Sequence, residues 1–194
     1  MKRVILITGT PCTGKTTLAK HLTTKLDALH INLTEFANKH HLILKQDPHR
    51  KTAIINETKM RKKITQTINT THKPNIIIDG HYAAAIVPKH LVTHTFVLRR
   101  NPIELRRLMK KRGYTGTKLW ENLASEILDV CLIEALRKQK KETVYELNAT
   151  DRTTENVTNE ITAILNKHKK CAAPSVDWLG MLEKKGLLDE YLKI

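Results

Sequence analysis

Five short apolar runs along the chain are separated by segments in which apolar residues recur at helical spacing. The runs show no alternation of apolar and polar positions, which is typical of strands buried on both faces of a parallel sheet. They lie at 3–8, 29–33, 75–79, 94–98 and 143–147. Because strands alternate with helices, the pattern predicts an α/β fold, a five-stranded parallel sheet with helices on both faces.

The segments between the runs predict the helices. Leu18, Leu22 and Leu26 share one face of the first helix, as a core-facing stripe requires. Further helices are expected from Pro102, a residue suited to a first helical turn, over 117–139 and 154–168, and within 176–192 after a break at Pro174. Residues 34–72 predict a short helix, a polar irregular stretch around Pro48 and a basic helix from Glu57.

The stretch GTPCTGKTT, at 9–17, follows the first run directly and opens the first helix. It matches G-x-x-x-x-G-K-[ST], a loop whose backbone N–H groups and helix dipole converge on phosphate oxygens. Lys15 is expected to bridge the β- and γ-phosphates of ATP, and the Thr16 hydroxyl to hold Mg²⁺. The alternative, a plain strand–turn–helix with a surface lysine, does not explain this combination of residues and setting.

The third run ends in IIIDGH, which supplies an acidic partner for the loop. Asp79 stands at the carboxyl end of its strand, where ligands of parallel sheets bind, and is expected to hold Mg²⁺ through water. His81 follows two residues later and would face the same site if the chain stayed extended. Asp79 as a cap and His81 as a backbone hydrogen-bonding residue are the alternatives.

A break at RGYTG, between two basic helices, indicates a hinged loop over the site. Arg112 stands at the hinge and is the arginine we expect to clamp a transferring phosphoryl group. Most of the other arginines of this region are expected to form an exposed basic face; the set is Arg99, Arg100, Arg106 and Arg107.

Composition narrows the class of protein. The chain has 194 residues, enough for one domain with a lid or tail, and a formal net charge of +15, which favours anionic partners such as nucleotides or RNA. It has no apolar run of about 18 residues, so no membrane span is expected. Its three cysteines, Cys12, Cys131 and Cys171, are far apart and favour a reducing, cytoplasmic location over disulfides or zinc.

Three basic runs leave two interpretations open. They lie at 59–63, 137–141 and 167–170. They could contact RNA phosphates, but no aromatic side chains interleave them as stacking platforms, and they also fit ordinary exposed helix faces.

The sequence resembles the adenylate kinase isoenzyme 6 family, the nuclear and archaeal branch of the adenylate kinases. The resemblance covers about residues 3–165. It rests on GTPCTGKTT, IIIDGH and RGYTGTKLWENLASEILDV, in which Lys118, Glu121, Asn122 and Glu126 keep the K-x-x-E-N-x-x-x-E spacing. The tail, SVDWLGMLEKKGLLDEYL, is similar to an extension of archaeal members.

The resemblance implies a P-loop kinase domain over 1–170, with a monophosphate-binding arm at about 32–56 and a short lid at about 113–123, and a helical extension over 171–194. It implies transfer of a phosphoryl group from ATP to AMP or a related monophosphate, and ATP hydrolysis. It also implies binding to a small-subunit ribosomal protein of the uS11 type, on or near rRNA, late in small-subunit maturation.

The same resemblance assigns site residues. ATP contacts are expected at Cys12, Gly14, Lys15, Thr16 and Thr17. It places the lid arginine at Arg112 and the acidic and water-positioning pair at Asp79 and His81. Backbone groups from Ala149 to Asp151 would face adenine.

Two departures from the family pattern affect these expectations. Cys12 stands where glycine is usual, so a positive φ there would store about 1–3 kcal/mol of strain. The arm carries one arginine, Arg50, where ordinary adenylate kinases clamp AMP with arginine. The residues that could replace such a clamp are Lys39, Lys45, Arg50 and Arg61.

Three functions follow from these observations. The first is phosphotransfer from MgATP to a nucleoside monophosphate, and the second is an ATPase switch in ribosome assembly, which His81, the net charge and the sparse arm favour. The two are compatible. The third, a small-molecule or RNA 5′-end kinase, rests on fold analogy alone.

Overall fold

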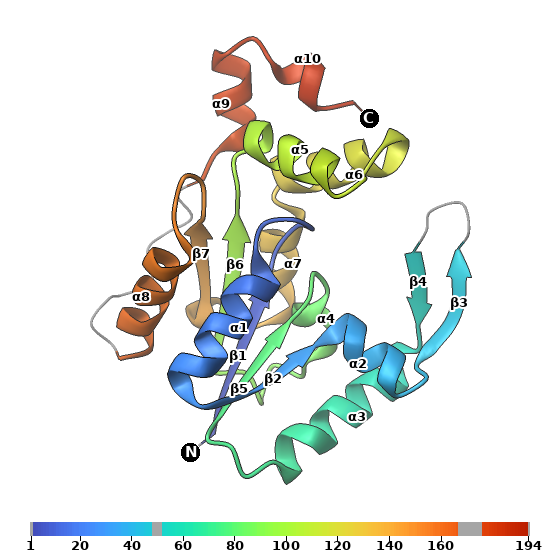
Figure 1. The fold of residues 1–194 in the computed structure, drawn as a ribbon, viewed down its shortest axis with the longest axis vertical. Helices are drawn as coiled ribbons and strands as arrows, with labels where there is room; N and C mark the ends of the chain where they lie inside the picture. Colours follow the sequence, from blue (N-terminus) through green and yellow to red (C-terminus); the bar gives the residue numbers. More distant parts are fainter. Residues whose placement is uncertain (1, 48–51, 167–175, 194) are drawn as a thin grey trace.

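The computed structural model describes residues 2–47, 52–166 and 176–193 (Figure 1). The strands are β1 (Arg3–Thr8), β2 (Ala28–Asn32), β3 (Ile43–Asp47), β4 (Thr52–Ile55), β5 (Asn75–Asp79), β6 (His94–Arg99) and β7 (Val144–Asn148). The helices are α1 (Lys15–Leu26), α2 (Leu33–Lys39), α3 (Glu57–Thr70), α4 (Ala83–Ile86), α5 (Pro102–Lys111), α6 (Gly116–Ile127), α7 (Val130–Lys138), α8 (Thr154–Leu165), α9 (Trp178–Lys184) and α10 (Leu188–Tyr191). Arg50, the run 167–170, Cys171 and the break at Pro174 lie outside the described residues.

The predicted five-stranded parallel sheet is confirmed, with the order β2-β5-β1-β6-β7. β1 is central, and its Ile7 pairs with Asp79 of β5. The loop that follows β1 and the carboxylate that ends β5 therefore lie at the same edge of the sheet. This is the edge at which open parallel sheets bind their ligands.

Alternate residues of the sheet enter two separate cores. Ile5 and Ile7 pack with α1 and α8 on one face, whereas Val4 and Leu6 pack with α3 on the other. Figure 1 shows the same arrangement, with α1 and α8 on one side of the strands. Because β1 is buried on both faces, its sequence has to be apolar without alternation.

The segment between β2 and β5 differs from the prediction. The stretch that the sequence predicts as irregular contains β3 and β4, an antiparallel hairpin in which Ile43 pairs with Ile55. The hairpin projects beyond the sheet between α2 and α3 (Figure 1). Its strands are stabilised mainly by pairing with each other, so neither carries the long apolar run of a core strand.

The predicted helix over 117–139 is interrupted. α6 ends at Ile127 and α7 begins at Val130, with Asp129 between them in the left-handed region at φ 57°. Aspartate tolerates this conformation better than most residues. Its carboxylate forms an ion pair with the buried Arg99, which holds the break in place.

The tail packs on the domain. Trp178 and Leu182 of α9 are buried, and the indole N–H of Trp178 donates to Oε1 of Glu126 on α6 at 3.0 Å. Arg106 of α5 pairs with Glu190 of α10 at 2.5 Å. The tail therefore packs against α5 and α6 of the domain. Across the described residues, we find no helix with the length and apolarity that a bilayer crossing requires.

Candidate functional site

The loop between β1 and α1 has the backbone conformation of a phosphate cradle. Gly9 has φ 136°, and a Cβ atom there would lie 2.3 Å from the carbonyl oxygen of Leu98, so only glycine fits. Gly14 has φ 104° and caps the N-terminus of α1. These glycines let the loop turn its amide groups inward, ahead of the positive end of the helix dipole.

Cys12, which stands where the family usually has glycine, has φ 69°. This is the positive φ at which a residue with a Cβ atom is strained. Its side chain packs beside Leu105 and Met109. Burial raises the pKa of the Cys12 thiol, although the positive charges of Arg112 and Lys15 oppose the shift. The thiol is therefore protonated at neutral pH and acts as a small apolar group in the loop.

We expect Cys12→Val to be less stable to unfolding than Cys12→Ala by about 1 kcal/mol. A β-branched side chain tolerates a positive φ poorly, and this cost should outweigh the larger apolar surface of valine. Urea unfolding of the two variants measures the difference. Equal stabilities would mean that the loop relaxes away from the observed φ.

Lys15 extends into the cavity from the first turn of α1. Its ammonium donates to the backbone carbonyl of Thr10 at 2.7 Å. Burial lowers the pKa of Lys15, and the nearby carboxylate of Asp79 opposes the shift. Because this bond goes to a carbonyl of the lysine's own loop, phosphate oxygens could replace that partner without a large movement of the side chain.

Asp79 is 1% exposed and is held by residues from two elements, α1 and β2. Its Oδ2 accepts from the Thr16 hydroxyl at 2.7 Å and from the Asn32 side chain at 3.0 Å. Nε2 of His30 lies 2.6 Å from its Oδ1. Thr16 and Asp79 thus offer two adjacent hard oxygen ligands, a pair that fits Mg²⁺, which usually retains several waters.

His30 and Asn32 are site residues that the sequence analysis missed. They lie two positions apart on β2, and β2 is next to β5 in the sheet. Asn32 also caps α2, because its side-chain oxygen accepts from the amides of Thr34 and Glu35. One side chain thereby joins the start of the arm to the carboxylate of Asp79.

His81 lines the same cavity as Asp79, but it reaches the cavity by a different route from the predicted extended chain. β5 ends at Asp79, and the chain turns through Gly80 before α4. The Thr8 hydroxyl fixes this turn by donating to the backbone carbonyl of His81 at 3.0 Å. The imidazole meets the ring of Tyr82 edge-on, with 4.7 Å between centroids.

The imidazole of His81 is neutral near pH 7. The side chain is open to the cavity, yet desolvation by the surrounding protein, with the positive charges of Lys15 and Lys118, lowers its pKa to about 4. A neutral histidine can both accept and donate a hydrogen bond, which suits it to orient a water molecule.

The segment predicted to form the hinge and the lid follows α5. Arg112 caps the end of α5 and lines the cavity beside Cys12. Gly113 has φ 77° and Gly116 has φ 54°, so the turn between α5 and α6 depends on glycine conformations. Lys118 lies in the first turn of α6, with its ammonium 5.7 Å from the ring centroid of Tyr114.

Arg99 is neither exposed nor part of the cavity, so the expectation of an exposed basic face is wrong for this residue. It is 1% exposed, and its guanidinium bonds Glu126 at 2.9 Å, Glu146 at 2.6 Å and Asp129. Burial disfavours its charge, but Glu126 and Asp129 outweigh this effect and raise the pKa of Arg99. The side chain joins β6 to α6 and β7.

Of the other arginines expected on this face, Arg107 is exposed, whereas Arg100 and Arg106 have structural partners. Arg100 pairs with Glu104 at 2.5 Å, and Arg106 lies over the rings of Trp120 and Tyr191 at 5.0 and 4.9 Å. Neither lines the cavity, so among the described arginines Arg112 alone does so.

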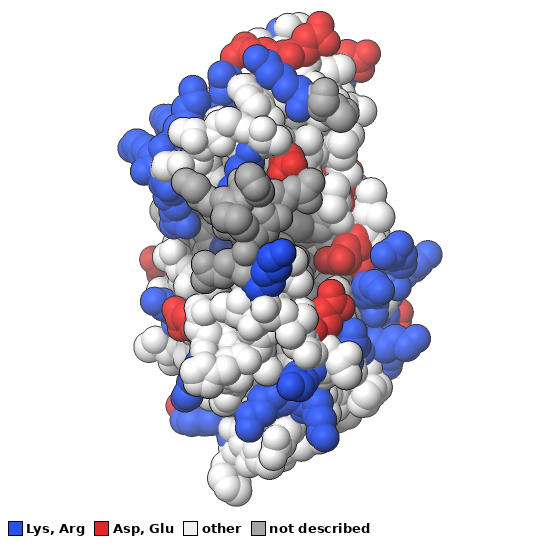
Figure 2. Space-filling model, turned by 90° about the vertical axis from the view of Figure 1, so that its right-hand side faces the viewer, with Lys and Arg blue, Asp and Glu red and all other residues white. Residues whose placement is uncertain are grey.

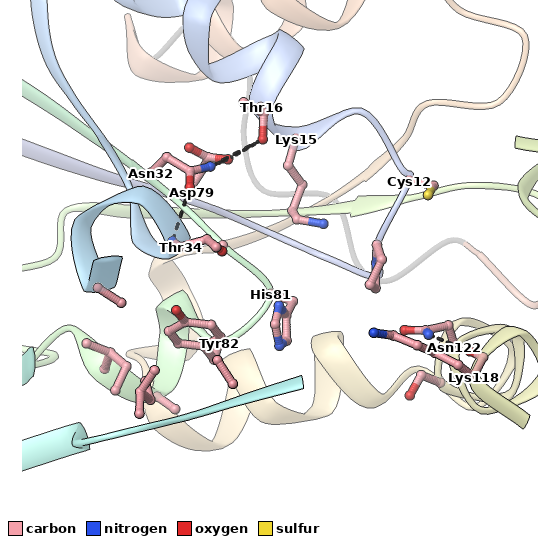
Figure 3. Close-up of a pocket in the computed structure, with 18 of the residues that line it drawn as sticks. Cys12, Lys15, Thr16, Asn32, Thr34, Asp79, His81, Tyr82, Lys118 and Asn122 are labelled. Atoms are coloured by element: carbon pink, nitrogen blue, oxygen red, sulfur yellow. Dashed lines mark hydrogen bonds between the residues drawn. The ribbon is translucent and has the colours of Figure 1, made fainter. Parts of the chain in front are cut away.

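One cavity of about 910 Å³ collects these groups. Its lining includes Cys12, Gly14, Lys15, Thr16, Thr17, Asp79, His81 and Arg112. Figure 3 shows Thr16, Asn32 and Asp79 together on one side and the lid residues Lys118 and Asn122 on the other, with Lys15 and His81 between them. The volume lies at the upper end of the range for small-molecule sites and leaves room for more than one ligand.

The residues proposed to face adenine lie elsewhere. The amide of Ala149 donates to the carbonyl of Arg99 at 2.8 Å, and the Thr150 hydroxyl accepts from the amide of Asn101 at 2.9 Å. Neither residue lines the cavity. Contact of this loop with adenine stays a prediction.

Comparison with known proteins identifies the family. Residues 5–129 match the family model described as an AAA domain. A protein of Methanocaldococcus jannaschii named "Putative adenylate kinase" is 39% identical over 90% of this chain and 92% of its own length. The protein of the same name from Saccharolobus solfataricus is 34% identical over 98% of this chain and 95% of its own length.

Solved structures agree on the fold. Shikimate kinase from Bacteroides thetaiotaomicron superposes with a TM-score of 0.56 at 18% identity, over 84% of this chain and 98% of that one. Thymidylate kinase from Candida albicans gives a TM-score of 0.53 at 17% identity, over 90% and 96%. The chain has a P-loop kinase-like fold, and it belongs to the family of its archaeal adenylate kinase relatives.

Proposed function

We propose that the protein transfers the γ-phosphoryl group of MgATP to AMP or a related nucleoside monophosphate, and that it also hydrolyses ATP. One observation supports this most directly: the loop residues, Asp79, His81 and Arg112 line a single cavity that the arm also lines. Relatives with the adenylate kinase name, similar over most of the chain, support the same acceptor.

In this proposal the protein contributes position and charge. Amides of the loop and the ammonium of Lys15 bind the β- and γ-phosphates, and Arg112 neutralises charge that spreads over the transferred group. An oxygen of the acceptor phosphate attacks the γ-phosphorus, the bond to the β–γ bridging oxygen breaks, and ADP leaves. Thr16 and Asp79 would hold Mg²⁺, which neutralises phosphate charge when bound.

ADP formation tests the proposal. Purified protein, ATP and Mg²⁺ should give ADP at a rate that rises with added AMP and reaches a plateau. The gain of ADP that depends on AMP must be twice the loss of AMP, since each transfer converts one AMP and one ATP into two ADP. A rate independent of AMP would reject the transferase function and leave hydrolysis alone.

His81→Ala is expected to slow AMP-independent ATP hydrolysis by roughly 10- to 100-fold, while ATP affinity changes by less than about threefold. In this proposal the neutral imidazole orients the attacking water, whereas the loop amides and Lys15 bind the phosphates. Phosphate release and calorimetry with ATP measure the two quantities. Parallel losses of both would show that His81 supports the fold of the site instead.

A second candidate function is an ATPase switch in the maturation of the small ribosomal subunit, with a uS11-type ribosomal protein as partner. The described arm, which places apolar groups along much of its side of the cavity, favours hydrolysis without a tightly held acceptor. The net charge of +15 favours a partner near rRNA. This function predicts a stable complex with that protein whose affinity depends on the bound nucleotide.

Direct contact with rRNA is a separate part of this second proposal. On the face shown in Figure 2, Lys and Arg gather in several groups with acidic side chains between them, and they form no continuous stripe. The affinity of the protein for single-stranded RNA, measured at several salt concentrations, tests whether it contacts RNA phosphates directly. A slope near zero in log affinity against log salt would remove RNA as a direct partner.

A third candidate, a kinase for a small molecule or an RNA 5′ end, has fold likeness as its support. Labelled ATP and a panel of acceptors would reveal such an activity. The cytoplasm is the location we propose, since the described cysteines, Cys12 and Cys131, are unpaired.

A further inference from the structure

The acceptor phosphate needs a positive partner, and the described arm places none in the cavity. The arm residues that line the cavity are Asn32, Thr34, Ala37, Ile43, Ala53, Ile54 and Ile55, and Glu57 follows the arm at the start of α3. These groups are mainly apolar or hydroxyl-bearing, and Glu57 would repel a phosphate dianion. The arm side of the cavity therefore suits a flat base better than a phosphate.

Of the cations suggested from the sequence as clamps, those that the structure describes do not line the cavity. Arg61 of α3 donates from Nη2 to the backbone carbonyl of Ala85 at 2.6 Å. Lys39 and Lys45 are exposed and do not line the cavity, and Arg50 is outside the described residues. Arg61 remains the nearest competitor, because Ala85 itself borders the cavity.

The cations that do line the cavity, within the described chain, are Lys15, Arg112 and Lys118. Lys15 belongs to the loop that holds the donor phosphates, and Arg112 lies beside Cys12 of the same loop. Lys118 is on the other side of the cavity from Thr16 and Asp79. Figure 3 shows its side chain extending from α6 toward His81.

The first turn of α6 fixes the base of this lysine. The side-chain amide of Asn122 donates to the backbone carbonyl of Lys118 at 2.6 Å. The ring of Tyr114 lies 5.7 Å from the ammonium and favours the cation on its face. Lys118 is thus held by α6 at its backbone and by Tyr114 along its side chain.

We propose that Lys118 binds the phosphate of the acceptor nucleotide from the lid side, while the arm holds the base in its apolar slot. This inference rests on the proposed phosphotransferase function. It makes the lid part of acceptor recognition, so that a monophosphate is bound by both the arm and α6. A nucleoside without phosphate would use the arm alone.

Binding of AMP and adenosine, measured by calorimetry, separates the phosphate contact from every other effect of a substitution. In Lys118→Ala, AMP affinity is expected to fall by roughly 10- to 100-fold, as for loss of a charge-assisted hydrogen bond, while adenosine affinity changes by less than about twofold. The KM for AMP in ADP formation should rise by the same factor. Lys118→Arg should recover part of the loss.

Two further variants serve as comparisons. Lys110 is an exposed lysine on α5 outside the cavity, and Lys110→Ala should leave both affinities and the rate of ADP formation unchanged. Arg61→Ala should leave the ratio of AMP to adenosine affinity within about twofold of wild type.

Three results would overturn the inference. One is a fall in the AMP-to-adenosine ratio with Arg61→Ala and not with Lys118→Ala. Another is an equal fall in both affinities with Lys118→Ala, which would assign it to the shape of the lid. The third is a wild-type protein that binds AMP no more tightly than adenosine. Wild-type protein that prefers AMP but forms no ADP would instead reject the proposed function and leave this contact standing.

Discussion

Replacement of Lys15 by Met should lower the rate of ADP formation by roughly 10³-fold. Methionine keeps most of the length of the side chain and removes its charge. In the structure the ammonium lies within the loop, 2.7 Å from the carbonyl of Thr10. It is therefore within reach of phosphate oxygens bound by the loop amides, and no other cation on the P-loop lines the cavity in the described residues.

The matched control for this experiment is Lys20→Met. Lys20 is exposed on the same helix, α1, and does not line the cavity, so its loss should leave the rate unchanged. Initial rates at saturating ATP and AMP give the comparison. If Lys15→Met kept more than about a tenth of the wild-type rate, the phosphates would have to be bound elsewhere.

Replacement of Glu126 by Ala should lower the free energy of unfolding by about 3–5 kcal/mol. Glu126 is 1% exposed and accepts from Nε of Arg99, the amide of Arg100 and the indole of Trp178. Alanine would leave three buried donors without this acceptor, and it would reduce the negative charge around a buried guanidinium.

Guanidinium chloride unfolding with linear extrapolation measures the loss. Glu126→Gln keeps an oxygen acceptor and should cost less than the alanine variant. Glu121 is an exposed carboxylate on the same helix, and Glu121→Ala should stay within about 0.5 kcal/mol of wild type. A Glu126→Ala variant as stable as Glu121→Ala would show that Arg99 is satisfied by Glu146 and Asp129 alone.

The sequence predicts much of the sheet, because strands buried on both faces must be continuously apolar. Ile5 and Ile7 of β1 and Ile77 of β5 have no exposed surface, and the apolar runs that contain them can be recognised from the sequence alone. The glycine loop can also be recognised from the sequence, because Gly9 and Gly14 have positive φ angles that residues with a Cβ atom rarely adopt.

Features that depend on contacts distant in sequence were not predicted. His30 and Asn32 contact Asp79 because β2 lies beside β5, and no local pattern gives that strand order. The break at Asp129 is held by Arg99, 30 positions away along the chain. The β3–β4 hairpin is local, but its short strands lack the continuous apolar run by which core strands are recognised. Lys118 was visible within its motif, but its position opposite the loop required the fold.

The contact between Trp178 and Glu126 joins α9 to α6, the helix that carries Lys118. A ligand that binds α9 and displaces it from the domain must break the hydrogen bond between the Trp178 indole and the buried Glu126 carboxylate of α6. If displacement of α9 changes the position of α6, binding of that ligand and binding of nucleotide in the cavity are coupled. Each then changes the affinity for the other by the same factor. α9 and the cavity therefore contact the same helix, α6, from different sides of the protein.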